Sequence, residues 1–277
     1  MGALLALASA LSYGFSDFLG GILSRRSGFA RVALLGQVGG LVTAAIAAPL
    51  VSSAEPRLTD LAWGALSGAG TGIGMVSLFR GMGRGAMSVV VPVSAVVGVA
   101  LPVLTSVTVF GERPAPAAWA GIALALPALW LVAGGTTGTR RALGDGLIAG
   151  FGIAVQYLAL AQASPSSGIW PVAAGRVAAI AVVALVALRL APRSNRTARV
   201  SRHDLGSLLA GALAALALVC YLFATRTQFL AVAVVLSSLY PIVPVLLGIT
   251  ALRERLRWRQ TIGLGGTLVA SVLIAIS

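Results

Sequence analysis

The sequence contains a long apolar stretch, residues 146–188, GLIAGFGIAVQYLALAQASPSSGIWPVAAGRVAAIAVVALVAL, in which Arg176 is the only charged residue. A helix that crosses a bilayer needs about 20 mostly apolar residues, because the hydrocarbon layer is roughly 30 Å thick. The stretch is too long for one such helix, and residues 164–168, SPSSG, have the composition of a turn. We therefore expect two membrane-spanning helices here, separated at this turn.

The same pattern recurs along the whole chain of 277 residues. It predicts ten membrane-spanning helices, over residues 2–23, 31–52, 60–82, 86–110, 116–135, 143–163, 168–190, 204–226, 230–252 and 258–276. The composition agrees, because 58% of the residues are hydrophobic and only 10% are charged, whereas a soluble domain carries about 25% charged residues. The segments are continuously apolar and do not alternate as the strands of a membrane barrel do. We predict an all-α integral membrane protein, which excludes a soluble enzyme.

The basic residues are distributed unevenly between the predicted helices. All twenty are arginine, and the net charge is +13. Sixteen of them fall in the odd-numbered connections and three in the even-numbered connections. Because basic loop residues are retained in the cytoplasm, we predict that both termini lie outside it. The arginine-rich, alanine-rich composition is typical of a GC-rich bacterium, which indicates the inner membrane, and the orientation role of the charge argues against a nucleic-acid partner.

The sequence offers no group of residues typical of catalysis or of a bound cofactor. Cys220 is the only cysteine and His203 is the only histidine, so neither a zinc site nor histidine-based acid–base chemistry is indicated. Residues 68–74, GAGTGIG, lack the glycine spacing of a dinucleotide-binding loop. Glycines at four-residue intervals instead predict close packing between membrane helices, here at Gly64, Gly68 and Gly72. We expect no metal, no cofactor and no catalytic residue.

The two halves of the sequence resemble one another weakly. Near the end of each half, residues 111–113, GER, correspond to residues 253–255, RER, at an offset of 142. Near the start, an offset of 139 aligns Asp17 with Gln156, Phe18 with Tyr157, and Gln37 with Arg176. Because five helices per half is an odd number, the second half must be inserted upside down. We predict two inverted five-helix repeats, residues 1–139 and 140–277, an arrangement typical of transport by alternating access.

This architecture resembles the EamA branch of the drug/metabolite transporter superfamily over essentially the whole chain. The residues that carry the resemblance are 13–18, YGFSDF, the pair Pro92 and Pro102, and the two Glu-Arg loops at Glu112 and Glu254. The resemblance implies a secondary transporter of small organic metabolites, often an exporter of amino acids or similar solutes. Cytoplasmic termini are commonly given for this family, and the arginine distribution of this chain departs from that placement.

Two charged side chains fall well inside predicted membrane segments. Asp17 and Arg176 lie far from the loop arginines, and an ionised group near the bilayer centre costs about 2.5 to 3.5 kcal/mol. With Gln156 and Gln37, their counterparts in the repeat, they place an acid, a base and two amides at the centre. Such a set can bind a zwitterion, Asp17 taking an ammonium group or a coupled proton and Arg176 a carboxylate. The alternative is that Asp17 and Arg176 form a structural ion pair.

Aromatic residues and prolines are further candidates for the solute site and its gate. Aromatic side chains can line a solute pocket, and the candidates besides Tyr13 are Phe18, Tyr157, Tyr221 and Tyr240. Tryptophans near the starts of segments are more typical of the membrane interface, here Trp63, Trp119, Trp170 and Trp258. Prolines at corresponding depths in the fourth and ninth segments are expected to interrupt them, either as a gate or as tolerated kinks, at Pro92, Pro102, Pro241 and Pro244.

Two other functional classes stay open on sequence alone. An integral membrane enzyme that acts on lipid-linked substrates usually needs clustered acids or histidines, whereas the seven acids of this chain are scattered. A channel or scaffold is the other alternative, although two related halves with one buried charge each favour a carrier. We expect membrane lipids and a small solute as the partners, and coupling of transport to protons stays open. A ten-helix unit can enclose its own pathway, so a monomer suffices.

Overall fold

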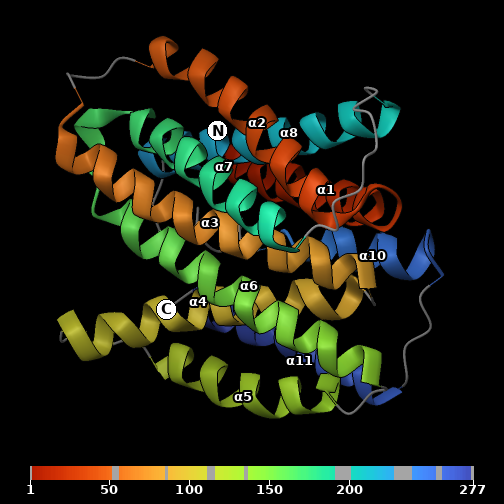
Figure 1. Cartoon of the computed structure of the whole chain (residues 1–277). Coiled ribbons are helices and arrows are strands. Elements are labelled where there is room, and N and C mark those ends of the chain that lie inside the picture. The colour runs from red at the N-terminus through yellow and green to blue at the C-terminus, as the bar shows by residue number, and fades with distance from the viewer. Residues whose placement is uncertain are drawn as a thin grey trace.

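The computed structural model describes residues 2–51, 56–84, 87–110, 116–133, 137–190, 201–227, 239–253 and 258–275. All regular secondary structure in these residues is helical (Figure 1). The first helices are α1 (Gly2–Ser27), α2 (Phe29–Ala47), the short 3-10 helix η1 (Ala48–Leu50), α3 (Leu58–Arg84), α4 (Met87–Phe110) and α5 (Pro116–Ala133). The remaining ones are α6 (Thr137–Ala161), η2 (Pro165–Ser167), α7 (Trp170–Leu190), α8 (Arg202–Thr227), α10 (Ile242–Thr250) and α11 (Trp258–Ala275).

Within the described residues, six helical stretches are long and apolar enough to cross a bilayer. They are Gly2–Ser27, Phe29–Leu50, Leu58–Arg84, Arg140–Leu160, Trp170–Arg189 and Arg202–Tyr221. The predicted all-α membrane class is therefore confirmed, and the chain is a multi-pass membrane protein. The full set of ten spans stays a prediction. In the ninth predicted segment, residues 230–252, the described helix is α10, whose nine residues are too few to cross a bilayer.

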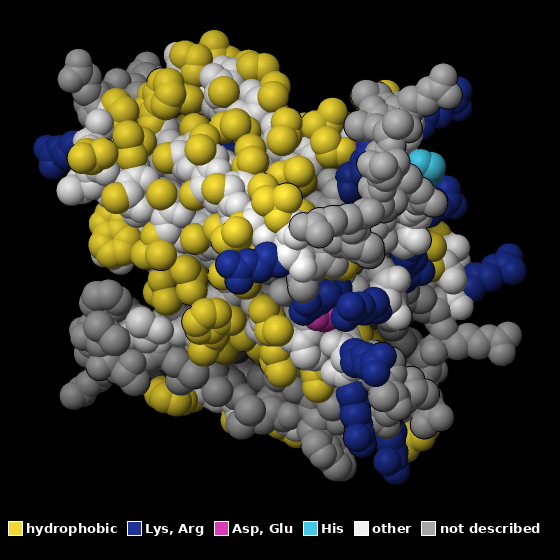
Figure 2. Space-filling model, viewed as in Figure 1, with side chains coloured by type: hydrophobic (Ala, Val, Ile, Leu, Met, Phe, Trp, Pro, Cys, Tyr) yellow, Lys and Arg dark blue, Asp and Glu magenta, His cyan; other side chains and the backbone are white. Residues whose placement is uncertain are grey.

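The surface of the molecule is that of a protein surrounded by lipid. Large apolar side chains are exposed along the helices, as at Leu4, Leu50 and Leu188, which are 71%, 80% and 83% exposed. Figure 2 shows apolar side chains over much of one face, while arginines gather toward one side of the molecule. An apolar surface of this extent is unfavourable in water and favourable against acyl chains.

The predicted tryptophan belt agrees with the positions of these residues. Trp63, Trp119, Trp170 and Trp258 are all partly exposed and lie close to the starts of α3, α5, α7 and α11. Indole rings favour the boundary between acyl chains and water, so these four side chains need no role in the interior.

Helix packing follows a pattern that relates the two halves. Helix α3 packs on α6 and α7, while α8 packs on α1 and α2, and α2 also contacts α7. The turn after α1 and the turn after α6 each contain a glycine with positive φ, Gly28 at 83° and Gly168 at 57°. Only glycine adopts this backbone region without steric cost. Both connections therefore contain a glycine at the turn between the two helices.

Helices from the two halves cross at glycines. A Cβ atom added to Gly68 of α3 would meet the backbone of Gly175 on α7, and one added to Gly211 of α8 would meet the backbone of Gly36 on α2. Such small residues allow backbones to approach closely in a membrane, where packing replaces the hydrophobic effect as the force that holds helices together. The packing role expected for the glycines of α3 agrees with these crossings.

Helices α3 and α8 each have an acid in the first turn that binds a neighbouring element. Asp204 of α8 accepts hydrogen bonds from Nε and Nη2 of Arg31, at 2.7 and 2.8 Å. Asp60 of α3 accepts hydrogen bonds from Oγ of Ser167 at 2.6 Å and from the backbone N–H of Ser164 at 3.0 Å. The start of α8 is thereby tied to the start of α2, and the start of α3 to the connection between α6 and α7.

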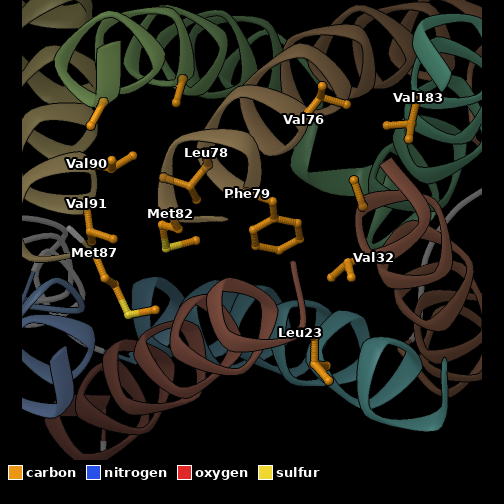
Figure 3. Packing of buried hydrophobic residues seen from close by; sticks show 13 residues of the cluster. Leu23, Val32, Val76, Leu78, Phe79, Met82, Met87, Val90, Val91 and Val183 are labelled. Carbon is orange, nitrogen blue, oxygen red and sulfur yellow. The ribbon is translucent and has the colours of Figure 1, made fainter. Parts of the chain in front are cut away.

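The main apolar core lies between helices of both halves (Figure 3). The ring of Phe79 occupies its middle, beside Leu23 of α1 and Val32 of α2, with Val183 of α7 and Met82 of α3 also buried in the cluster. Along both α1 and α3, these residues come between the centre of the helix and its arginine-bearing end. The core therefore closes the interior toward the arginine-rich side.

Candidate functional site

A first cavity lies in the middle of the helices, next to Asp17. Its volume is about 50 Å³, and its walls come from α1, α3, α6 and the turn before α10: Tyr13, Asp17, Thr71, Gly74, Met75, Leu78, Ile153, Gln156, Tyr157 and Tyr240. A water molecule needs at least about 10 to 15 Å³ by this measure. The cavity therefore has room for a few water molecules, and a larger solute requires the helices to separate.

A second cavity of about 20 Å³ lies next to Arg176. Helices α3, α6, α7 and α8 form its walls, through Ser67, Gly68, Thr71, Gln156, Leu160, Val172, Gly175, Arg176 and Leu218. Thr71 and Gln156 line both cavities. The acid and the arginine thus face neighbouring compartments that share one polar wall.

The carboxylate of Asp17 is buried without compensation. The residue is 4% exposed, and among the described residues no side chain or backbone group forms a hydrogen bond or ion pair with it. Arg176 is not its ion-pair partner, so the structural ion pair considered from the sequence is not formed here. A buried charge is unfavourable unless it is paired, and the described residues supply no such pair to Asp17.

Arg176 is equally buried but is held by an amide. It is 4% exposed, and its Nη1 donates a hydrogen bond of 2.8 Å to Oε1 of Gln37 on α2. Gly40 makes room for the side chain, because a Cβ atom at that position would lie 3.2 Å from Nε of Arg176. Gln37 and Arg176 are the two residues that the repeat aligns, and they meet where α2 contacts α7. Among the described residues, no carboxylate neutralises this guanidinium.

The shared wall is organised by a hydrogen bond between α3 and α6. Oγ1 of Thr71 lies 2.9 Å from Oε1 of Gln156, to which it donates. The larger cavity is also lined by Tyr13 and Tyr240, whose rings are tilted by 54° with centroids 6.1 Å apart. The hydroxyl of Tyr13 is buried and has no hydrogen-bond partner among the described residues. The wall therefore offers unused polar groups to a bound molecule.

Most of the predicted site residues come together around these two cavities. Asp17, Gln156, Tyr157 and Tyr240 line the first, Arg176 and Gln156 line the second, and Gln37 contacts the second through Arg176. Phe18 instead packs against the apolar core, and Tyr221 lines neither cavity. Thr71 was not predicted, because it lies among the glycines of α3, whose spacing indicated packing.

The prolines do not break the fourth helix. Helix α4 runs continuously from Met87 to Phe110, so Pro92 and Pro102 do not divide it into two helices, and the alternative of tolerated kinks stays open. Pro241 directly precedes the first residue of α10, and Pro244 lies in the first turn, where a proline leaves no hydrogen bond unmade. The gating role of these residues stays a prediction. Glu112 and Glu254 lie outside the described residues.

The ion pairs found among the described residues involve none of the residues that line the two cavities. Besides the pair of Arg31 with Asp204, Nη2 of Arg80 on α3 lies 2.6 Å from Oδ1 of Asp145 on α6. Within the described part of the chain, no cluster of histidine, cysteine and acidic residues has the makings of a metal site. The chemistry of the interior is therefore that of a small set of isolated charges and amides.

Comparison with known proteins is consistent with this architecture. Residues 142–276 match the EamA-like transporter family, which confirms the resemblance inferred from the sequence. A solved crystal structure of another protein has the same fold, with a TM-score of 0.62 and 19% sequence identity over 99% of this chain and 96% of that chain. At this identity the likeness concerns the fold alone. No curated protein sequence matches this chain.

Proposed function

Because residues 142–276 place this chain in the EamA-like transporter family, we propose that it is a secondary transporter of a small zwitterionic solute such as an amino acid. Members of the family are transporters rather than enzymes, and their partners are a small solute and the membrane lipids. Export across the bacterial inner membrane is the direction we propose. The arguments that follow concern the solute and the transport cycle.

The observation that carries this proposal is the pair of uncompensated charges in adjacent compartments. Asp17 and Arg176 are both buried and neither meets an opposite charge among the described residues. A solute with an ammonium group and a carboxylate would neutralise both at once. Binding would replace two unfavourable buried charges by two hydrogen-bonded pairs, which favours a zwitterion over a solute with a single charge.

Alternating access is supported by the relation between the halves. The contacts of α3 with α6 and α7 have counterparts in the contacts of α8 with α1 and α2. Gly28 and Gly168, with an offset of 140 residues, make equivalent turns, and Gln37 meets its own counterpart, Arg176. These relations support two inverted repeats, residues 1–139 and 140–277, around an axis between α2 and α7. In the proposed cycle, the two repeats exchange conformation and so open the site to one side at a time.

The state of the cavities fits a stage in such a cycle. The apolar core around Phe79 separates the cavity of Asp17 from the arginine-rich side. The cavities hold only water-sized molecules as they stand. Loading of a solute therefore requires motion of whole helices, and the close crossings at Gly68 and Gly211 are where α3 and α8 would pivot.

The test is transport by the purified protein in liposomes. Labelled alanine, leucine and threonine are supplied with and without a proton gradient, and the wild type is compared with Asp17→Asn and Arg176→Gln. We expect both substitutions to abolish uptake at unchanged protein content, while Arg189→Gln, at the exposed end of α7, transports normally. Transport of amino acids by either cavity variant at the wild-type rate would refute the assignment of that residue. A rate that depends on the proton gradient, and loses this dependence in Asp17→Asn, would assign proton coupling to Asp17.

A further inference from the structure

The hydrogen bond between Thr71 and Gln156 has a defined direction. The Thr71 hydroxyl has one hydrogen and two acceptors in reach, Oε1 of Gln156 at 2.9 Å and the carbonyl oxygen of Ser67 at 3.0 Å. Within α3 the carbonyl of Ser67 also accepts the backbone N–H four residues later, as in any α-helix. Gln156 Oε1 has no other donor among the described residues. Because a buried acceptor left without a donor is costly, the hydrogen belongs to the bond with Gln156.

This direction fixes which end of the Gln156 amide faces the cavities. With its oxygen held by Thr71, the side-chain nitrogen is left to face the cavities, where the hydroxyl of Tyr13 is its described polar neighbour. The residue lines both the cavity of Asp17 and the cavity of Arg176. The amide therefore presents donors, not an acceptor, to whatever occupies the shared wall.

The smaller cavity collects donors from two helices. Arg176 of α7 has five N–H groups and uses one of them on Gln37, and Gln156 of α6 adds its amide nitrogen. No acidic side chain is among the residues that line this cavity. A guanidinium and an amide that converge on one compartment match the two oxygens of a carboxylate.

The corresponding place in the other half is built differently. At an offset of 143, residues 64–76, GALSGAGTGIGMV, align with residues 207–219, SLLAGALAALALV, which superimposes Gly68 on Gly211 and Thr71 on Ala214. At the position that corresponds to Thr71, α8 carries Ala214 and so has no hydroxyl with which to hold Asp17, the counterpart of Gln156. One half holds its polar group in a donor arrangement, and the other leaves its carboxylate free.

We propose that Thr71 is a positioning residue that turns the amide of Gln156 so that its nitrogen and the guanidinium of Arg176 together bind a carboxylate. As far as that carboxylate belongs to the transported solute, this inference rests on the proposed function. The donors bind a free carboxylate equally well, because the recognition is local. The cavity of Arg176 is then the carboxylate end of the site, and the cavity of Asp17 is its ammonium end.

The test uses acetate and methylammonium as probes, which carry one of the two charges each. Thermal unfolding of the purified full-length protein in detergent is followed while sodium acetate or methylammonium chloride is titrated at constant ionic strength. We expect acetate to raise the Tm of the wild type in a saturable way. Loss of one hydrogen bond to a charged ligand weakens binding about tenfold, so Thr71→Val is expected to need about ten times more acetate for the same shift.

The matched variants separate positioning from general damage. Thr71→Ser keeps the hydroxyl and is expected to restore the acetate response. Thr43→Val removes a hydroxyl of α2 that bonds to its own helix at Gly39, and it is expected to respond as the wild type does. The response to methylammonium, which is directed to Asp17, is expected to be unchanged in Thr43→Val. Because Thr71 also lines the cavity of Asp17, the methylammonium response is expected to fall less than the acetate response in Thr71→Val.

Each outcome decides the inference. A wild type without an acetate response, or Thr71→Val with the wild-type response, would overturn it. If Thr71→Val does not fold, Gln156→Glu replaces the donor amide by an acid of the same size, and an undiminished acetate response in that variant would overturn it equally. An intact acetate response in a protein that transports no amino acid in liposomes would refute the proposed solute and leave the carboxylate site standing.

Discussion

Substitution of Gly68 by alanine is expected to weaken the crossing of α3 and α7. The added methyl group would meet the backbone of Gly175, and a backbone cannot turn away as a flexible side chain does. Overpacking of this kind costs about 1 to 3 kcal/mol. Against this stands a gain of up to about 1 kcal/mol, because alanine favours a helix more than glycine does. The net expectation is a loss of about 1 kcal/mol in the free energy of unfolding.

The control for this prediction is Gly144→Ala in α6. A Cβ atom at Gly144 has no neighbouring atom within 4 Å, so only the gain in helix preference remains and the protein is expected to become slightly more stable. The two variants should therefore differ by about 2 kcal/mol, which corresponds to roughly 4 to 8 °C in Tm for a chain somewhat larger than about 200 residues. Circular dichroism of the purified proteins in detergent measures this difference. Equal Tm values for the two variants would show that α3 and α7 are not in backbone contact at this position.

Three further outcomes are expected. Asp17→Asn keeps or raises the Tm while transport is lost, because the buried carboxylate has no bond to forfeit; a clear fall in Tm would reveal a structural partner. Asp204→Asn lowers the free energy of unfolding by about 1 to 2 kcal/mol, because it breaks a two-point contact with Arg31, whose side chain is 43% exposed and so partly screened. Added salt screens this ion pair in the wild type, so it should change the Tm of the variant less than that of the wild type. A reporter that is active only in the cytoplasm, fused at Ser277, is expected to stay silent, and activity would reverse the predicted orientation.

Much of the fold follows from composition and the length of apolar runs. The turn at residues 164–168 is present, with a 3-10 helix and the positive φ of Gly168, because proline and glycine leave few other conformations open. The helices extend beyond the predicted segments at several ends, as α6 does by starting at Thr137. Polar residues at a helix end cost nothing when they reach water, so hydropathy alone does not locate these boundaries.

The residues of the candidate site that could be predicted are those whose charge is unfavourable inside a membrane. Asp17 and Arg176 stand out because an apolar segment tolerates a charge only for a reason. Thr71 gave no such signal, since a threonine satisfies its own helix, and its second role depends on the distance between α3 and α6. Phe18 packs against the apolar core. Its alignment with Tyr157 fixes a depth in the membrane and not a direction around the helix.

The ion pairs between acids and arginines that lie far apart in the sequence could not be predicted from it. Asp145 meets Arg80, and Asp204 meets Arg31, although 65 and 173 residues separate them. These contacts result from helix packing, whose register the repeat pattern constrains only coarsely. Besides the predicted role in orientation, Arg31, Arg80 and Arg84 therefore also tie helices together.

The one-sided arrangement of arginines seen in Figure 2 bears on the choice of lipid for any reconstitution. Each arginine near a bilayer surface gains about 1 kcal/mol from anionic headgroups. Vesicles rich in phosphatidylglycerol should therefore hold that end of the protein firmly, whereas purely zwitterionic vesicles give it no electrostatic preference. Both leaflets of such a vesicle attract that end, so the direction of insertion has to be measured before influx and efflux are assigned.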